Sequence, residues 1–385
     1  MLGRNPARSI GVDIGASGIR AAELKYVPAT DSYEVTKTAS FELALVPERE
    51  GDEQHRTHTI KALRKLWRTG RFASRKVTIG VSDSSLITRQ LDLPWMPPED
   101  FGRALPFQIQ DSLPVEVSTV EIDYHLLNQV QGRDALGQET PVNRILVVAA
   151  SREAVTRECN IVRKAGLIPI SADSAAFALI RASCQGVIPA DPSIRVLVDI
   201  GAEQLTVIIH QAGQPQFIRT ISNFGGRTAT EEIARELDVT EQAAEQLKMA
   251  TGLNGPIQTI AAVPESSVFR GLLAKDQSTE DPTSQRIMKV LNPWATTVIK
   301  EIRDSIDYFV SSQPNAKVGS IILGGRGSRL SGLIERIATE LPHPVVELEA
   351  FAGLKTASKV SAVAPHDGAD PDFTIAIGLA MGSHP

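Results

Sequence analysis

The chain has 385 residues, too many for one ordinary domain and enough for two domains with separate hydrophobic cores. Hydrophobic residues make up 42% and charged residues 22%, a balance that excludes an intrinsically disordered chain. The formal net charge of -5 supplies no overall basic field, so nucleic acid is not an expected partner.

Basic residues gather in one short stretch, in which apolar residues recur at helical spacing. This pattern predicts an amphipathic helix with a solvated basic face, and contact with nucleic acid or anionic lipid is the less favoured interpretation. The basic residues of the stretch are Lys61, Arg64, Lys65, Arg68, Arg71, Arg75 and Lys76.

The cysteines and the hydropathy pattern indicate the compartment. Cys159 and Cys184 have neither the CxxC pattern nor the spacing of a zinc site, and we expect both to be buried apolar residues in a reducing environment. A strand at residues 9–12 opens the chain without a preceding apolar segment, which argues against a secretory signal. No apolar stretch is long enough to span a bilayer. The sequence therefore predicts a soluble, cytoplasmic protein.

The first part of the chain is predicted as an α/β unit that ends at a proline cluster, residues 94–98. A small α+β block is predicted to follow the prolines. The expected elements in chain order are the amphipathic helix, strands at 77–82 and 86–93, a helix from 101 to 112, a strand at 120–128, a solvated loop at 129–141, a strand at 144–150, a helix at 153–165 and a strand at 167–170.

The second part of the chain is predicted from residue 199 onward. Thr228 and Glu231 have the spacing of a capping box, which predicts the start of a helix that ends at about Leu237. The remaining elements are predicted as a helix at 241–250, an irregular segment at 252–285, a helix at 286–311, a strand at 319–323, a helix at 333–340, a loop at 360–371 and a closing segment at 373–381.

The most informative observation is an internal repeat of an apolar strand, the sequence Asp-Ile-Gly-Ala and a second apolar strand. Asp13 lies in the first copy and Asp199 in the second, and their separation is far too long for a solenoid, which indicates a duplicated domain. Both turns are followed by β-like segments, at residues 19–24 and 205–209. This excludes the P-loop and Rossmann patterns, because these require a helix directly after the glycines.

Each aspartate of the repeat ends an apolar strand, so the carboxylates of Asp13 and Asp199 are expected at the edge of a sheet. Small residues beside them let main-chain N–H groups approach an anion closely. Two such hairpins would hold a phosphate chain, and their aspartates would hold Mg²⁺ through water. The alternative is an ordinary turn after each strand. The small residues are Gly15, Ala16, Ser17, Gly18, Gly201 and Ala202.

The two hairpins resemble the phosphate-binding loops of the actin, Hsp70 and sugar-kinase superfamily. Residues 321–332 resemble its adenosine motif, a strand and a helix joined by a glycine pair. Gly324 and Gly325 would let main chain lie flat against a purine, whereas a plain turn is the alternative. The resemblance implies an α/β protein with a duplicated ribonuclease-H-like fold, two lobes around a nucleotide cleft, and ATP and Mg²⁺ as ligands.

Further residues acquire a role through this resemblance. Glu245 and Lys248 lie on one helical face and match the pair that contacts the nucleotide ribose and base in bacterial actin relatives, with a solvent-exposed ion pair as the alternative. Arg20 stands where the superfamily often carries lysine, and it can still donate to phosphate. The expected nucleotide-binding set is completed by Gly225, Arg326 and Gly327.

Several segments resemble, in order, the type IV pilus assembly family PilM. They are residues 13–20, 93–97, 120–127, 177–181, 301–308 and 322–326. This family shares with the division protein FtsA a subdomain inserted in the first lobe, and residues 95–170 are expected to form it. The other expected domains are a first-lobe core at 1–94 with 171–193 and 372–385, and a second lobe at 194–371 with a helical subdomain at about 227–285.

The residues expected to support hydrolysis depart from the family pattern. Ala175 stands where the family tends to carry an acidic residue, which leaves Asp173 as the candidate that orients the attacking water. An alternative role for Asp173 is the N-cap of a helix that begins at Ser174. We therefore expect ATP binding with slow or absent hydrolysis.

The resemblance implies a cytosolic adaptor that is held at the inner membrane by a protein partner. The expected partner is the N-terminal cytosolic peptide of a PilN-like membrane protein, in a groove near residues 86–94 and the insertion. Assembly-platform ATPases and further copies of this chain are additional candidates, and direct insertion into the membrane is not expected. Two alternatives stay open, an FtsA-like filament-forming or cell-division protein and a small-molecule kinase.

Each alternative lacks a feature that it would typically require. An FtsA-like filament former would typically end in a basic amphipathic helix, a pattern that residues 375–385 lack. A kinase would need a substrate-base aspartate in the second quarter of the chain and, in one branch, a zinc-binding cysteine cluster. The spacing of the two cysteines excludes that branch, and nothing in the sequence marks a sugar pocket.

Overall fold

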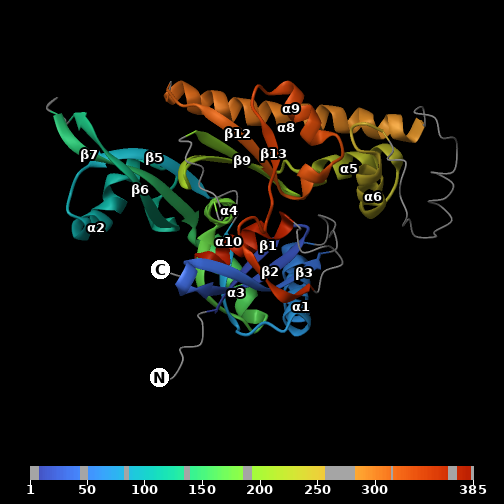
Figure 1. Cartoon of the computed structure of the whole chain (residues 1–385), viewed down its shortest axis with the longest axis horizontal. Helices are drawn as coiled ribbons and strands as arrows, with labels where there is room; N and C mark the ends of the chain where they lie inside the picture. Colours follow the sequence, from blue (N-terminus) through green and yellow to red (C-terminus); the bar gives the residue numbers. More distant parts are fainter. Residues whose placement is uncertain are drawn as a thin grey trace. The chain divides into compact units, whose positions relative to one another are not determined.

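The computed structural model describes residues 8–43, 51–81, 86–133, 139–184, 193–255, 282–313, 315–362 and 371–382. The chain forms two compact units (Figure 1). Unit 1 consists of Met1–Ile194, Ile208–Arg219 and Glu349–Pro385, and unit 2 consists of Arg195–Val207 and Thr220–Leu348.

Unit 1 is built around a six-stranded sheet in the order β14-β3-β2-β1-β4-β8. β1, β2 and β3 are antiparallel, β4 and β8 run parallel to β1, and β14 pairs in parallel with β3. The carboxyl ends of β1, β4 and β8 therefore meet at one edge of the sheet. The strands are β1 (Arg8–Gly15), β2 (Gly18–Val27), β3 (Ser32–Glu42), β4 (Lys76–Val81), β8 (Ile168–Ser174) and β14 (Lys355–Ala362).

Helices cover both faces of this sheet, because apolar side chains alternate between its two sides. Along β2, Ala21 packs in one cluster with residues of α1 and α3, whereas Ala22 and Leu24 pack in another with residues of α4 and α10. The basic stretch forms α1 as expected, with Leu63 and Leu66 buried on its inner face. The helices are α1 (Gly51–Gly70), α3 (Arg152–Lys164), α4 (Ala175–Ser183) and α10 (Thr374–Met381).

The C-terminal helix α10 lies in direct main-chain contact with its neighbours. A Cβ atom at Gly11 in β1 would lie 2.0 Å from the carbonyl oxygen of Ala376, and one at Gly378 in α10 would lie 1.9 Å from that of Ala178 in α4. These positions accept only glycine, since main-chain atoms cannot turn away as a side chain does. The approach buries α10 almost completely in the core of unit 1.

A separate three-stranded antiparallel sheet, β5-β7-β6, also belongs to unit 1. α2 covers it, with Phe101, Leu105 and Ile109 packed against Ile145 and Val147 of β7. The elements are β5 (Ile87–Pro94), α2 (Pro98–Gln108), β6 (Val120–Arg133) and β7 (Glu139–Ser151).

The observed pairings differ from the expected ones in this region. The predicted loop at 129–141 is mostly a hairpin of β6 and β7, in which Val130 pairs with Val142. Strands that project from the core do not need the apolar pattern of a buried strand, so the sequence pattern did not indicate them. β5, expected in the first-lobe core, pairs with β7, whereas α3 and β8 pack with the six-stranded sheet. The separate sheet thus extends from β5 to β7, although the expected insertion covered residues 95–170.

Unit 2 contains most of a five-stranded sheet in the order β11-β10-β9-β12-β13. The end of β10 and the start of β11, Ile208–Arg219, belong to unit 1. The order β3-β2-β1-β4 in the six-stranded sheet corresponds to the order β11-β10-β9-β12 in the five-stranded sheet. This equivalence is the duplication that the repeat predicts. The elements are β9 (Ile194–Ile200), β10 (Gln204–Gln211), β11 (Gln214–Ser222), α5 (Gly226–Leu237), α6 (Glu241–Thr251), α8 (Pro282–Ser312), β12 (Val318–Gly324), α9 (Leu333–Glu340) and β13 (Val345–Glu347).

Three local expectations in the second part need correction. Thr228 is not the N-cap residue: α5 begins at Gly226 with Gly225 as its N-cap, and Thr228, at the third helical position, accepts a hydrogen bond from the Gly225 N–H on Oγ1 at 3.4 Å. The predicted loop at 360–371 begins as β14, which pairs with β3 and belongs to unit 1 rather than to the second lobe; residues 363–370 lie outside the described residues. Most of the irregular segment at 252–285 also lies outside them.

Two further expectations concern burial and hydropathy. Cys159 and Cys184 are partly exposed rather than buried. Cys159 lies near the middle of α3 and packs only partly against the core, and Cys184 is the C-cap residue of α4. No described helix is long and apolar enough to cross a membrane.

The contact between α10 and α4 predicts the effect of adding one methyl group. Gly378→Ala is expected to destabilise the protein by roughly 1–3 kcal/mol or more, because the new Cβ atom meets the Ala178 main chain. Gly102→Ala, in the interior of α2, is the matched control: nothing lies within 4 Å of its Cβ position. It should be neutral or stabilise by about 0.5–1 kcal/mol. Urea unfolding midpoints measure both, and equal effects would contradict the close approach.

Candidate functional site

In unit 1 the first copy of the repeat is a tight antiparallel hairpin. Asp13 lies near the end of β1 and directly opposite Arg20 of β2, and Gly15 pairs with Gly18 across the turn. A Cβ atom at Gly18 would lie 2.8 Å from the Phe41 carbonyl oxygen of β3. Glycine at this position therefore serves the packing of the hairpin on β3 as well as any ligand.

Arg20 is buried and neutralised by carboxylates. Its Nη2 lies 3.0 Å from Asp372 Oδ2 and 3.6 Å from Glu42 Oε1, with only 6% of the Arg20 side chain exposed. Its Nη1 lies 3.0 Å from the Cβ position of Gly18, directly against the turn. Asp372, in the 3-10 turn before α10, was not predicted as a site residue, because nothing in its local sequence points toward Arg20.

The environment of Asp13 favours its protonated form. Burial raises the pKa of the Asp13 carboxyl to about 6, the positive charge of Arg20 lowers it, and the negative charge of Asp372 raises it. A cation held near Asp13 would favour the ionised carboxylate instead. Among the described residues, no group of three or more His, Cys, Asp or Glu side chains could hold a metal ion. The expectation that Asp13 and Asp199 hold Mg²⁺ through water therefore stays a prediction.

Asp13 and Asp173 lie at the same edge of the six-stranded sheet, each near the carboxyl end of its strand. Val12 of β1 lies beside Ile79 of β4, and Gly80 of β4 lies beside Asp173 of β8. β4 therefore separates the two aspartates, which end strands that are two strand spacings apart, roughly 10 Å.

The carboxylate of Asp173 is engaged on both oxygens. Oδ2 is ion-paired with Arg181 of α4, and Oδ1 accepts a hydrogen bond from the Ser174 N–H at 2.7 Å. Arg181 also donates from Nε to the carbonyl oxygen of Gly378, at 3.1 Å. Ser174, not Asp173, occupies the N-cap position of α4, so the N-cap expectation for Asp173 is wrong. Through Arg181, Asp173 therefore connects β8 to α4 and α10.

In unit 2 the second copy of the repeat is fixed by the start of α5. The Gly201 N–H donates to the Gln204 carbonyl oxygen at 2.9 Å, which closes the turn. The N–H groups of Gly226 and Arg227 donate to the carbonyl oxygens of Gly201 and Ala202, at 2.9 and 2.8 Å. The helix N-terminus therefore holds the turn that follows Asp199.

Three glycines allow neighbouring main-chain segments to pack closely against this turn and the end of β9. A Cβ atom at Gly225 would lie 2.5 Å from the Ala202 carbonyl oxygen, and one at Gly327 would lie 2.4 Å from Ile200 Cγ2. Gly325 has a φ of +76°, and a Cβ atom there would lie 2.5 Å from Asp199 Oδ1. The expected adenosine motif and the second hairpin are thus in direct contact.

Gly324, the other half of the glycine pair, has a packing role. It is buried at the end of β12, and a Cβ atom there would lie 2.6 Å from Leu348 Cδ2. A Cβ atom at Gly324 would therefore require the Leu348 side chain to shift, which gives this glycine a packing role that does not depend on a purine. Arg326 follows in the next turn and is partly buried.

Lys248 is buried and pairs with Glu245, whose side chain is 39% exposed, so the pair is neither fully buried nor a simple surface pair. The Lys248 Nζ atom lies 2.6 Å from Glu245 Oε2 and donates to the Gly226 carbonyl oxygen at 2.9 Å and to Thr230 Oγ1 at 2.8 Å. Only 7% of the Lys248 side chain is exposed. Burial lowers the pKa of the Lys248 ammonium below its ordinary value, although Glu245 acts in the opposite direction. This geometry places a cation against the first turn of α5.

Trp294 and Thr230 complete the group in unit 2, and neither was predicted. The buried Trp294 indole Nε1 donates to the Gly225 carbonyl oxygen at 2.9 Å. Thr230 Oγ1 bonds to Glu245 Oε2 at 2.5 Å and to the Gly226 carbonyl oxygen at 3.0 Å. The one sequence signal was the position of Trp294 directly after a proline within a long helical pattern, which did not reveal its partner.

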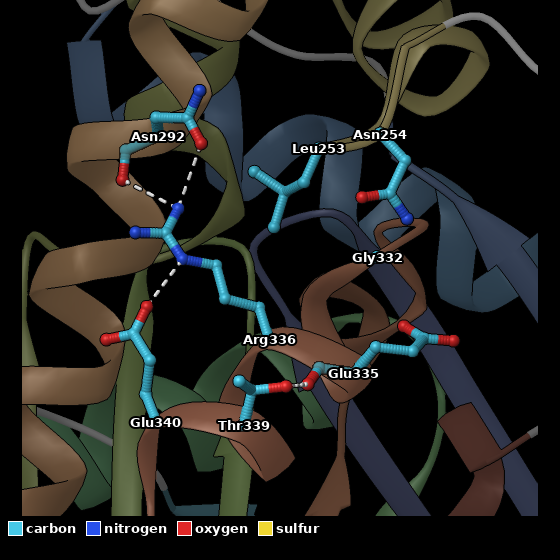
Figure 2. A pocket seen from close by; sticks show the side chains of 8 residues that line it. All are labelled: Leu253, Asn254, Asn292, Gly332, Glu335, Arg336, Thr339 and Glu340. Atoms are coloured by element: carbon cyan, nitrogen blue, oxygen red, sulfur yellow. Dashed lines mark hydrogen bonds and ion pairs between the residues drawn. The ribbon is translucent and has the colours of Figure 1, made fainter.

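A cavity of about 340 Å³ lies elsewhere in unit 2 (Figure 2). Its central side chain is Arg336 of α9, which bonds to Asn292 and Glu340 in the same view and to Thr296 beyond it. None of the predicted nucleotide-binding residues lines this cavity. The lining residues are Leu253, Asn254, Asn292, Gly332, Glu335, Arg336, Thr339 and Glu340.

The structure thus gathers the predicted residues into two groups, one in each unit. The unit 1 group contains Asp13, the Gly15–Gly18 turn and Arg20, with Asp173 farther along the same sheet edge. The unit 2 group contains residues that contact one another around the end of β9. They are Asp199, Gly201, Ala202, Gly225, Lys248 with Glu245, Gly325 and Gly327.

Comparison with known proteins agrees with this architecture. The sequence matches the family model described as type IV pilus assembly protein PilM over residues 11–261 and 274–384. A solved structure described as the PilM-PilN type IV pilus biogenesis complex matches with a TM-score of 0.75 and 22% sequence identity, covering 99% of this chain and 100% of that chain.

Two other solved structures are more distant. The ethanolamine utilization protein EutJ from Carboxydothermus hydrogenoformans matches with a TM-score of 0.50 and 14% identity, covering 98% of this chain and 90% of that one. A diol dehydratase-reactivating factor in nucleotide free form matches with a TM-score of 0.51 and 11% identity, covering 98% of this chain and 99% of that one.

The duplicated sheets, their matching hairpins and these structural matches show the duplicated α/β fold that the sequence predicted. Because the family match extends over most of its length, the chain belongs to the type IV pilus assembly protein PilM family.

The raised pKa of Asp13 predicts a pH-dependent gain in stability for Asp13→Asn. Between its ordinary value of 3.8 and about 6, the folded protein holds a proton that the unfolded chain releases, so the wild type loses stability as pH rises through this window. Asparagine cannot titrate, so the variant should be more stable at pH 7.5, by at most about 3 kcal/mol, with the gain shrinking toward pH 4. Asp111→Asn, at an exposed position, is the control. Melting temperatures of the variant and the wild type between pH 4 and pH 7.5 measure this gain in stability. A gain that does not change with pH would contradict the prediction.

Proposed function

We propose that this protein binds ATP with Mg²⁺ through the two repeated hairpins and acts as a nucleotide-dependent adaptor in type IV pilus assembly. One observation carries the nucleotide proposal. The same hairpin, an aspartate at the end of a buried strand followed by a glycine turn, occupies the same place in two sheets. A single such hairpin is explained by an ordinary turn, but its repetition at equivalent positions supports a shared ligand.

Each group of residues has chemistry that suits part of a nucleotide. In unit 1, the turn that follows Asp13 offers main-chain N–H groups, and Arg20 lies against it as a fixed cation. In unit 2, Lys248 places an ammonium group at the first turn of α5, beside the Glu245 carboxylate. Asp13 and Asp199 would hold the water shell of Mg²⁺, whose charge offsets that of the phosphates.

Slow hydrolysis follows from the contacts of Asp173. A carboxylate that orients water must be accessible to it, but Asp173 is ion-paired with Arg181 and accepts from the Ser174 N–H. Its neighbour Ala175 offers no replacement. We therefore propose that the protein binds the nucleotide without rapid turnover and that the nucleotide acts on the conformation of the chain. It can do so only if it binds two arrangements of the chain with different affinities.

The proposed partner is the N-terminal cytosolic peptide of a PilN-like membrane protein, which would hold this protein at the cytoplasmic side of the inner membrane. The likeness to the chain of the PilM-PilN complex supports this choice. β5 is an edge strand of the separate sheet, and an extended peptide can add to such an edge with its side chains in adjacent pockets. Trp95, directly after β5, is 49% exposed and offers an apolar contact there.

The nucleotide proposal predicts Mg²⁺-dependent stabilisation by ATP. Millimolar ATP with Mg²⁺ should raise the melting temperature of the wild type, because a ligand that binds only the folded state stabilises it by mass action, about 2.7 kcal/mol at a hundredfold excess over Kd. Asp13→Ala and Asp199→Ala should each reduce the Mg²⁺-dependent part of the shift. Differential scanning fluorimetry measures it.

Asp111→Ala is the matched control and should keep the full shift, since Asp111 is exposed and distant in sequence from both hairpins. Phosphate release in the same samples should stay well below about one per second. A wild type without any shift at millimolar ATP would refute the nucleotide proposal, and rapid release abolished by Asp173→Asn would refute the assigned role of Asp173.

The partner proposal predicts that Trp95→Ala weakens binding of the peptide. Isothermal titration with the first dozen or so residues of the PilN-like protein encoded beside this chain should give saturable binding to the wild type. Loss of a central aromatic contact should weaken it roughly tenfold or more. Tyr308→Ala is the matched control, because Tyr308 of α8 is also an exposed aromatic residue, 66% accessible, in the other unit. Equal binding by both variants would place the peptide away from β5, and no binding to the wild type would refute the partner.

A further inference from the structure

Unit 1 carries nine exposed basic side chains in two chain segments that contain no aspartate or glutamate, residues 61–76 and 159–172. The first four follow the i, i+3, i+4, i+7 spacing of a single stripe on α1. The nine residues, hereafter the basic patch, are Lys61, Arg64, Lys65, Arg68, Arg71, Arg75, Lys76, Arg163 and Lys164.

Three contacts join the two segments into one surface. Arg64 of α1 donates from Nη2 to the carbonyl oxygen of Lys164, at the end of α3, at 2.6 Å. The Ile168 N–H donates to the Arg75 carbonyl oxygen at 2.8 Å. The Arg75 guanidinium lies 3.9 Å from the Cβ position of Gly166, over the turn that joins α3 to β8. α1 and α3 are accordingly drawn side by side in unit 1 (Figure 1).

The charge of the basic patch is not balanced locally. In the part of the chain that the structure describes, none of the nine cations forms an ion pair with a carboxylate, whereas Arg20 and Lys248 each do. The whole chain has a net charge of -5, so its negative charge lies elsewhere on the surface. Nine like charges repel one another, and an anionic partner would relieve this repulsion.

Two exposed aliphatic side chains border the basic patch. Ile168 is 52% exposed and Ile170 is 55% exposed, and both lie on the edge strand β8, which bulges at Ile170. The Ile168 N–H bonds to the Arg75 main chain, which places this part of β8 beside the basic patch. Cations beside exposed aliphatic groups suit an anionic bilayer, which offers charged headgroups and an apolar boundary together. Nucleic acid would contact the cations through phosphate but offers little to aliphatic side chains, since bases are bound mainly by polar and aromatic groups.

We propose that the basic patch, together with Ile168 and Ile170, binds the anionic lipid headgroups of a membrane surface directly. The contact is peripheral and does not require insertion of a helix. It is independent of the proposed nucleotide and peptide sites, whose residues lie outside the basic patch. Each Lys or Arg near such a surface strengthens binding about fivefold, so that three of them account for about a hundredfold.

The test is co-sedimentation of the full-length protein, without any partner, with lipid vesicles. The wild type should bind vesicles of phosphatidylcholine with one third phosphatidylglycerol, bind pure phosphatidylcholine vesicles at least tenfold more weakly, and be released by 0.5 M salt, as expected for screened charges. The triple variant Lys61→Gln, Arg68→Gln, Lys76→Gln should bind the anionic vesicles about a hundredfold more weakly.

A matched triple variant changes the net charge equally but lies elsewhere. Arg103→Gln, Lys289→Gln and Lys317→Gln remove three exposed cations outside the basic patch and should leave vesicle binding unchanged. The double variant Ile168→Ser, Ile170→Ser should weaken binding while keeping its salt dependence. Circular dichroism and melting curves establish that each variant is folded.

Three outcomes would overturn the proposal. They are the absence of wild-type binding to anionic vesicles, an equal loss of binding in both triple variants, and patch-dependent binding to a DNA duplex without binding to vesicles. The last result would replace the membrane with nucleic acid as the partner of the same surface.

Discussion

The carboxyl end of β9 is enclosed by main chain at distances that leave no space for side chains. Gly225 lies against the Ala202 carbonyl oxygen, and Gly325 lies against Asp199 and the end of the strand. Because main-chain atoms cannot move aside independently, these contacts fix the start of α5 and the turn after β12 relative to Asp199. The position of Lys248, which bonds to the Gly226 carbonyl oxygen, depends on the same arrangement. The geometry of the site in unit 2 is therefore set by backbone packing before any ligand contributes.

The cations of the candidate site are placed by carboxylates in a comparable way. Arg20 is held by Asp372, and Lys248 is held by Glu245. Both cations have very little exposed side-chain surface, whereas the Glu245 side chain is 39% exposed. Removing one partner of a buried ion pair leaves an uncompensated charge, which is strongly destabilising. These pairs therefore keep the two cations in defined positions and charged. The link from Arg20 to Asp372 also connects the first hairpin to the turn that starts α10.

The fold persists although the sequence identity to its solved relatives is low. The matched chain of the solved PilM-PilN complex is 22% identical to this chain yet has a TM-score of 0.75. What the architecture requires is modest in sequence terms: alternating apolar residues in two sheets of equal strand order, and glycines where main chain meets main chain. Many apolar residues of similar volume satisfy the first requirement, whereas Gly11 and Gly378 have no substitute.

The sequence by itself determined the duplicated hairpins and the helices α6, α8 and α9, because these depend on local periodicity, turn glycines and capping residues. Only the tertiary structure decided that β5 pairs with β7 and that Arg20 meets Asp372, a residue 352 positions away. A strand's pattern records which face is buried but not which strand lies beside it. An ion pair between distant segments leaves no periodic signal at all, so the partners of the candidate site residues became evident only when the chain had brought them together.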